Sequence, residues 1–300
     1  MLNFFHRWPG TLRGAIWMVL GGTSLVLLAV TIRDLQDTYG VLQMIFMRSV
    51  ISLLLILPWV LKQRRKDLQT RRLGLHCFRN TIHYVGNVGW FIGVTLVPLA
   101  DLSALQFTVP LFTICFAALF LPERVGSHRW IATAIGFAGA LVVIRPGFIE
   151  ISLGTIAVVS SAACYAASQV STKSLSQTDN PNAILFYMSI IFIPISMGPA
   201  LVDWVTPSWE DAFSIFLLGF FGYLAHACII RSFAAADASF VMPFDFVRLP
   251  IAAAIGFFLY YEKPDLWVWI GAIIIFGATY FNTWRETRKT GDGREEKVDQ

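Results

Sequence analysis

Charged side chains are scarce in this sequence. Asp, Glu, Lys and Arg make up 14% of the 300 residues, whereas a soluble domain carries about 25%. Hydrophobic residues reach 56%, and the mean hydropathy is +0.63. Such a chain cannot cover its surface in water, which excludes a soluble enzyme, and its apolar content excludes an intrinsically disordered protein. The composition therefore predicts a polytopic membrane protein.

Reactive and metal-binding motifs are missing as well. The four cysteines lie inside apolar runs, and no CxxC or Cys/His spacing occurs, so we expect buried thiols rather than disulfides or metal ligands. The chain has no nucleophile elbow, phosphate loop, HExxH or nucleotide-binding motif. We therefore expect no cofactor, no metal, no nucleic-acid partner and no ATP-driven transport within this chain.

Ten apolar stretches are long enough to cross a bilayer, because about 20 mostly apolar residues span roughly 30 Å of hydrocarbon as a helix. We expect an all-α integral membrane protein with spans at 13–32, 40–61, 75–97, 101–121, 128–145, 152–174, 182–202, 211–234, 239–260 and 265–284. The first span is expected to remain as an anchor, because it is too long for a signal peptide. Residues 285–300 lack an apolar run and are expected to form a polar, mobile tail.

Basic residues are distributed unevenly between the two sides of these spans. If the N-terminus is cytoplasmic, sixteen of the 23 Lys and Arg residues lie on the cytoplasmic side and only three on the other. Loops rich in Lys and Arg stay in the cytoplasm. Because the number of spans is even, we expect both termini to be cytoplasmic.

The second half of the chain repeats the first. A shift of 140 residues aligns 14–58 with 154–198 without a gap. Other matched positions, at shifts of 136 to 140, are Arg33 with Lys173, Asp101 with Asp237, Ser103 with Ser239, Glu123 with Glu262 and Trp130 with Trp269. The repeats divide the chain into 1–147, 148–284 and the tail. Because each copy holds five spans, the second is inverted in the membrane, an arrangement typical of secondary transporters with a substrate site near the midplane.

Several segments carry a distinctive pattern. They are FMRSV around Arg48, FRN at 78–80, PLADLSALQFTVPLF at 98–112, LPERVGSHRW at 121–130, GFAGALVVIRPG at 136–147 and YEKP at 261–264. With these segments the chain resembles the ten-helix EamA branch of the drug/metabolite transporter superfamily, whose members have two EamA repeats.

The resemblance implies a multi-pass protein of the bacterial inner membrane that moves a small organic metabolite by alternating access. Amino acids and related compounds, riboflavin and S-adenosylmethionine are the cargoes it suggests, with a proton or a counter-substrate left open as coupling partner. Arg48 matches the arginine of the family's second span. We expect Arg48 to have a structural role, pairing with a carbonyl or carboxylate between helices.

A polar stripe follows the third span. Arg79, His83, Asn87 and Trp90 are spaced by four, four and three residues, which places them on one helical face. Because ionised groups at mid-membrane cost about 2.5–3.5 kcal/mol, such a face should point into the bundle, where it offers donors, acceptors and a ring to a planar or zwitterionic cargo. The alternative is that His83 and Asn87 only bond neighbouring helices, while Arg79 extends to the cytoplasmic rim.

The ninth span holds a second group of candidates. Pro243 and Pro250 predict that its helix is kinked or broken, a feature that marks transporter sites. Asp245 and Arg248 lie between them and are expected to pair, and an amino acid would compete for both with its ammonium and carboxylate. The alternative is a purely structural ion pair. As the only acid predicted well inside a span, Asp245 is also the candidate for a coupled proton.

Weaker candidates lie on other spans. They are Tyr165, Gln169 and Thr172 on the sixth and Tyr223 and His226 on the eighth. We expect the matched glutamates at the ends of the fourth and ninth spans to fix interfacial loops. A membrane enzyme and a channel remain as rival classes, although the sequence has neither paired intramembrane carboxylates nor a pore loop or ring of charge.

Overall fold

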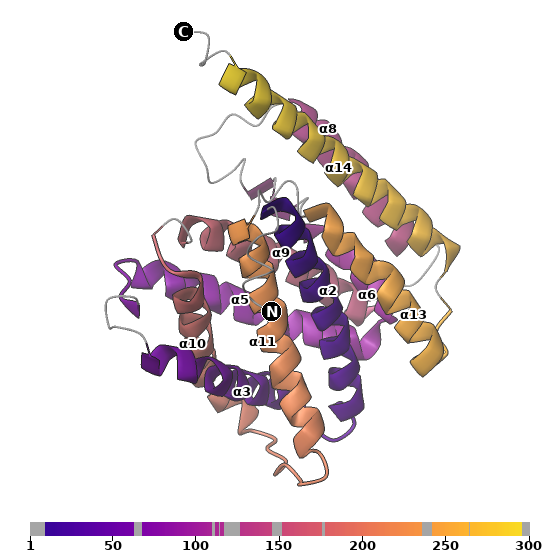
Figure 1. The fold of residues 1–300 in the computed structure, drawn as a ribbon. Helices are drawn as coiled ribbons and strands as arrows, with labels where there is room; N and C mark the ends of the chain where they lie inside the picture. The colour runs from indigo at the N-terminus through magenta and orange to yellow at the C-terminus, as the bar shows by residue number, and fades with distance from the viewer. Residues whose placement is uncertain are drawn as a thin grey trace.

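The computed structural model describes residues 10–62, 68–109, 112–113, 115–116, 127–145, 152–175, 178–235, 242–263 and 265–295. Within these ranges every regular element is a helix (Figure 1). The helices are α2 (Gly10–Leu35), α3 (Val41–Lys62), α5 (Leu73–Leu96), α6 (Leu99–Gln106), α8 (Ser127–Ile144), α9 (Leu153–Leu175), α10 (Pro181–Ala200), α11 (Ala212–Ala235), the 3-10 helix η1 (Met242–Val247), α13 (Arg248–Tyr260) and α14 (Leu266–Glu295).

The helices follow the apolar ranges of the sequence. Five of them are long and apolar enough to cross a membrane by length and composition, namely Gly10–Leu35, Val41–Lys62, Leu153–Thr172, Asn182–Ala200 and Ala212–Ser232. α5 has 24 residues and is equally long. It is absent from that set because the polar stripe lowers its mean hydropathy.

Burial is arranged as expected for a protein that lipid surrounds. Large apolar side chains are exposed on several helices, with Leu54, Phe213, Phe258 and Ile273 at 58%, 71%, 75% and 68%. Strongly polar side chains are buried instead, including Gln43, Arg48, His76, Arg79, Asn80, His83, Asn87 and Gln106. The interior therefore holds the groups that hydrocarbon disfavours.

Two of the expected spans are interrupted. The ninth was expected to be kinked or broken, and it changes helix type: the 3-10 helix η1 ends at Val247 and α13 begins at the next residue, Arg248. The fourth was expected to run continuously over 101–121, but α6 ends at Gln106 and a turn follows at 107–108. The reason is Pro110, which has no N–H to offer the carbonyl of Gln106. Both breaks thus lie about three residues before a proline.

The helices pair across the two halves of the sequence. α2 packs along α11 and α5 along α9, so the first helix of each half lies against the third helix of the other. α3 packs on α10, α6 on α13 and α8 on α14, each pair joining equivalent helices of the two halves, and the last pair lies at one edge of the bundle (Figure 1). The contacts therefore have the internal two-fold equivalence that the repeat predicts.

Glycines allow the closest of these approaches. A Cβ at Gly89 would lie 2.8 Å from the carbonyl oxygen of Ala157, and one at Gly21 would lie 2.9 Å from Cγ1 of Ile229. The backbones of α5 and α9, and of α2 and α11, thus approach within distances that a larger residue would prevent.

The C-terminal segment is helical over most of its length. Residues after 284 were expected to form a polar, mobile tail, and α14 continues as a helix to Glu295. The mobility of this segment stays a prediction. The sequence RETRKT lacks proline, and lengthening an existing helix avoids the unfavourable nucleation of a new one.

Candidate functional site

His83 lies at the centre of a cluster of rings in the bundle interior. Its ring centroid is 5.0 Å from that of Tyr165 on α9, 5.2 Å from that of His226 on α11 and 5.7 Å from that of Phe192 on α10. Its Nδ1 lies 3.1 Å from the Ser168 hydroxyl, while its Nε2 is buried with no partner among the described residues. Three predicted site residues therefore meet in one place, with an unsatisfied imidazole nitrogen between them.

The other residues of the polar stripe have different surroundings. Arg79 is buried and donates to the Thr172 hydroxyl at 3.0 Å and to Oδ1 of Asn80 at 2.6 Å. It therefore does not extend to the rim. Asn87 is buried too, but its amide donates to the carbonyl of His83 one turn earlier, 3.0 Å away. This bond within the helix satisfies part of the Asn87 amide without a cargo.

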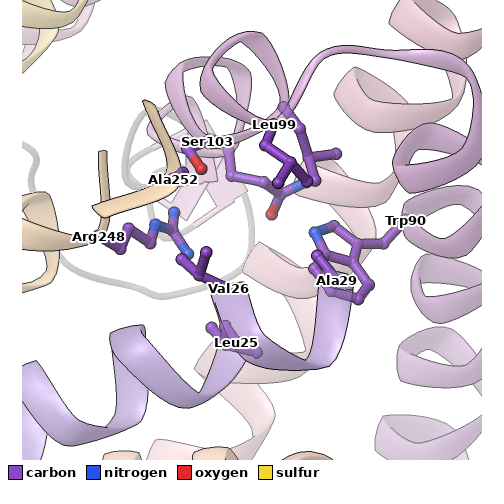
Figure 2. A pocket seen from close by; sticks show the side chains of 10 residues that line it. Leu25, Val26, Ala29, Trp90, Leu99, Ser103, Arg248 and Ala252 are labelled. Carbon is purple, nitrogen blue, oxygen red and sulfur yellow. The ribbon is translucent and has the colours of Figure 1, made fainter. Parts of the chain in front are cut away.

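Trp90 and Arg248 face each other across a small cavity (Figure 2). They enter from opposite sides, with Leu99 and Ser103 of α6 above and Val26 of α2 below. Its other lining residues are Leu25, Ala29, Leu102, Gln106 and Ala252. We call it the Trp90 cavity. A water-sized sphere can occupy about 20 Å³ of it, room for about one water molecule.

The predicted pair of Asp245 and Arg248 is present. Their closest oxygen and nitrogen atoms are 3.4 Å apart, and the guanidinium lies over the ring of Phe107 at 4.9 Å from its centroid. Nε of Arg248 is buried and unpartnered in the described part of the chain. Because the ion pair is long and incomplete, both side chains keep hydrogen-bonding capacity beside the breaks in α6 and η1–α13.

A second cavity of similar size lies between α3, α10 and α11. Arg48, Tyr223 and His226 line it, together with Ser49, Ser52, Leu185, Met188, Ser189, Phe192 and Gly222. We call it the Arg48 cavity. The expected carbonyl or carboxylate partner of Arg48 is not found, since no described residue accepts a hydrogen bond from it and its Nε is buried. The guanidinium instead lies over the ring of Phe91, whose centroid is 5.6 Å from Cζ.

Gln169 lies apart from these groups, on an exposed side of α9. Sequence reasoning missed Gln106, which lines the Trp90 cavity and donates to the Ser161 hydroxyl at 2.8 Å, and Ser103 and Phe192. A glutamine within an apolar run was the available signal for Gln106, whereas nothing in the sequence distinguishes Phe192 from the other phenylalanines.

A network of charge closes one end of the bundle. Arg33 at the end of α2 forms an ion pair with Glu262 and donates to the carbonyls of Val94 and Val97 at 3.0 and 2.6 Å. The second oxygen of Glu262 accepts from the backbone N–H of Leu99 at 2.9 Å, at the start of α6. We call this network the Arg33–Glu262 lock. It confirms that Glu262 fixes loops at a helix end.

The same end carries a second ion pair, between Arg145 after α8 and Asp265 before α14. Glu123, the repeat counterpart of Glu262, lies outside the described residues. Arg33, Glu262, Arg145 and Asp265 all lie at helix ends or in loops that the basic-residue distribution assigns to one side of the membrane.

Separate contacts join the other end of α5 to the loop between α9 and α10. Nε2 of His76 lies 2.7 Å from Oδ2 of Asp179, in the loop between α9 and α10. Burial raises the pKa of the Asp179 carboxyl, but hydrogen bonds from His76, Thr70 and Thr178 outweigh it and hold the pKa below its ordinary value of 3.8. In the repeat, Asp179 corresponds to Tyr39, whose hydroxyl donates to Asp211 at 2.7 Å. The two ends of the bundle are thus closed at equivalent positions by different chemistry.

The EamA-like transporter family model matches the chain twice, over residues 12–145 and 152–284. The two matches coincide with the two halves that pair helix by helix.

Relatives with a named activity match over nearly their full length. The riboflavin transporter of Vibrio cholerae is 30% identical over 93% of this chain and 95% of its own. That of Rhizobium johnstonii is 32% identical over 92% of each chain. The S-adenosylmethionine uptake transporter of Rickettsia prowazekii is 26% identical over 95% of this chain and 97% of its own.

A solved crystal structure has the same fold, with a TM-score of 0.64 and 15% identity over 93% of this chain and 98% of that one. The crossed helix pairs, the paired helix breaks and the double family match agree with one another. The chain is therefore a member of the EamA-like transporter family.

Proposed function

We propose that this protein is a secondary transporter that carries a small organic metabolite across the bacterial inner membrane by alternating access. The observation that carries the proposal is the pair of irregular helices, α6, which ends in a turn, and η1–α13, which changes helix type, because they pack on each other beside Trp90 and Arg248. Interrupted helices present free backbone groups to a bound ligand, and they occur at the substrate sites of inverted-repeat transporters.

The proposed topology has ten spans, with both termini and the segment after 284 in the cytoplasm. The repeats are 1–147 and 148–284. Contacts between loops support this arrangement, because the Tyr39 and Ser208 loops touch each other and the 68–72 segment touches α9 and α10. Each set joins segments that the topology assigns to one side.

The arrangement favours an occluded resting state. The Arg33–Glu262 lock closes the end assigned to the periplasm, the His76–Asp179 contact joins loops at the cytoplasmic end, and each interior cavity has room for about one water molecule. A metabolite therefore enters only after one set of end contacts opens, as alternating access requires.

The proposed cargo is riboflavin, S-adenosylmethionine or a similar metabolite, by analogy with the relatives. A flat ring system suits the rings of Trp90, Tyr165 and His83, and its polar edge suits Arg248, Asp245 and His226. We propose no chemical step, so the cargo should emerge unchanged.

Transport by the purified protein in liposomes tests the proposal, with radiolabelled riboflavin and S-adenosylmethionine as probes. We expect saturable uptake of at least one probe, reduced at least fivefold in Trp90→Ala. The matched control is Trp209→Ala, because Trp209 is 95% exposed. Ion conductance without saturable uptake would favour a channel, and recovery of a modified cargo would favour an enzyme.

A further inference from the structure

Arg48 is a buried charge without a hydrogen-bond acceptor among the described residues. Its side chain is 3% exposed, it lines the Arg48 cavity, and no described residue accepts a hydrogen bond from it. Gly222 makes room for it, because a Cβ at that position would lie 2.8 Å from Cδ of the arginine. The ring of Phe91 faces the cation but leaves the buried Nε–H without an acceptor among the described residues.

The charges of the described residues around it do not balance it. Asp245 is already paired with Arg248, and Arg79 is a second buried guanidinium whose described partners, Thr172 and Asn80, are neutral. A buried cation without a counter-ion is strongly unfavourable in a bilayer, so such a residue is expected to have a partner that binds during function.

Equivalent segments of the two repeats meet at the cavity. Under the shift of 140 residues, Arg48 corresponds to Met188, Ser49 to Ser189 and Ser52 to Phe192, and all six line the cavity. α3 and α10 therefore face each other across it with matched residues. The arginine is present on the α3 side only, because its counterpart on α10 is Met188, so the cavity has a single positive end.

The hydroxyls of Ser49 and Ser189 donate to carbonyls of their own helices, and that of Ser52 points to the carbonyl of Gly219 at 3.5 Å. Arg48, Tyr223 and His226 are therefore the donors in this cavity that remain for a ligand. A guanidinium is the side chain best suited to hold a planar or tetrahedral oxyanion, because its parallel N–H groups form paired charged hydrogen bonds.

We propose that the Arg48 cavity binds an oxyanion group of the cargo, a carboxylate or a phosphate, and that Arg48 is the residue that holds it. This inference rests on the proposed transport function and deepens it, since within the proposed cargo class it favours metabolites with an anionic end, such as S-adenosylmethionine, over neutral riboflavin. The structural role expected for Arg48 from the sequence is thereby replaced by a role in recognition.

Two matched pairs of probes separate charge from shape. Riboflavin and riboflavin 5′-phosphate differ by one phosphate, and S-adenosylmethionine and its decarboxylated form differ by one carboxylate. Binding to the purified full-length protein is measured by calorimetry for wild type, Arg48→Gln, Arg48→Lys and the control Arg231→Gln. Arg231 is the suitable control because it is an intramembrane arginine of α11 that donates to its own helix at Ala227.

We expect wild type and Arg231→Gln to bind the anionic member of at least one pair at least tenfold more tightly than its counterpart. Arg48→Gln should bind both members alike, and Arg48→Lys should retain part of the preference. The pair that shows the preference tells whether the group is a phosphate or a carboxylate. The melting temperature of Arg48→Gln should equal or exceed that of wild type, because the substitution leaves no partner behind.

Equal affinity for both members of both pairs in wild type, or an unchanged preference in Arg48→Gln, would overturn the inference while leaving transport intact. A lower melting temperature of Arg48→Gln with unchanged preference would return Arg48 to a structural role. If none of the four probes binds, the melting temperature is measured with millimolar acetate and with millimolar inorganic phosphate to test the oxyanion site. A melting temperature that they raise in wild type but not in Arg48→Gln supports the oxyanion site, and equal behaviour refutes it. Absent uptake of every probe would count against the proposed function separately.

Discussion

Replacing Glu262 by Gln should open the periplasmic end of the protein. The Glu262 carboxylate pairs with Arg33 of α2 through one oxygen and caps the first N–H of α6, at Leu99, through the other. The amide keeps the size of the side chain but loses the charge, so it weakens both interactions at once. Gly256 leaves the space that either side chain occupies.

The size of the effect follows from the contacts. A hydrogen bond to a charged group contributes about 1.5–3 kcal/mol. The Arg33 and Glu262 side chains are 9% and 18% exposed, so solvent weakens the pair only in part, and the amide retains some of its bonding. We therefore expect the closed state to lose about 1–2 kcal/mol, or roughly five- to thirtyfold in its population relative to the open state.

Cysteine accessibility measures this population. With the four native cysteines replaced, Ser103→Cys places a thiol in the Trp90 cavity, where the native side chain is 7% exposed. A membrane-impermeant thiol reagent added from outside reacts with it when the periplasmic end opens. Glu262→Gln should raise the reaction rate by the factor given above.

The matched control is Glu210→Gln, because Glu210 is an exposed glutamate in a loop assigned to the same side. An unchanged rate in Glu262→Gln, or an equal rise in Glu210→Gln, would refute the view that the Arg33–Glu262 lock holds this end closed.

Three further outcomes are expected. Labels at Gln69 and Ser208 should react from opposite sides of the membrane, and reaction from the same side would exclude the ten-span topology. Removing Asp245 or Arg248 alone should destabilise the protein by about 3–5 kcal/mol. The double variant Asp245→Asn/Arg248→Gln should regain the wild-type melting temperature but lose transport activity. A double variant that transports at the wild-type rate would show that the pair has no role in the mechanism. Burial raises the pKa of the Asp179 carboxyl, but hydrogen bonds from a histidine and two threonines lower it by more than burial raises it. The pKa therefore lies below its ordinary value. The stability that this carboxylate adds over Asp179→Asn should therefore be complete above about pH 4 and vanish as the pH falls through the lowered pKa. A difference in melting temperature that does not shrink as the pH falls below about 4 would contradict this.

The sequence was sufficient to place the helices and one of the two breaks. The apolar runs predicted the helix ranges, because the length and hydropathy of a segment alone decide whether it can span the hydrocarbon core of a bilayer. Pro243 and Pro250 predicted the break before α13, but Pro110 stands alone in a long apolar run, where a kinked continuous helix is equally compatible with it. The break after Gln106 therefore required the structure.

The candidate site was predictable only in part. The spacing of Arg79, His83, Asn87 and Trp90 placed them correctly on a buried face. Tyr165 and Gln169 are also four residues apart, yet one joins the ring cluster and the other is exposed. The neighbouring helices set the boundary between buried and exposed faces, and a single helix does not encode it. The missing partner of Arg48 depends likewise on distances between helices.

The crossed pairing of helices has a consequence for how the protein is made. α2 is the first of the described helices to leave the ribosome, but its main partner, α11, begins only at Ala212, about 180 residues after α2 ends. At roughly 5–20 residues per second, α2 waits on the order of 10–40 s in the membrane before α11 is synthesised. Its close-packing surface, with the glycine at position 21, meets lipid or an insertion factor during that interval. Neither half of the chain is therefore expected to assemble before the other has been inserted.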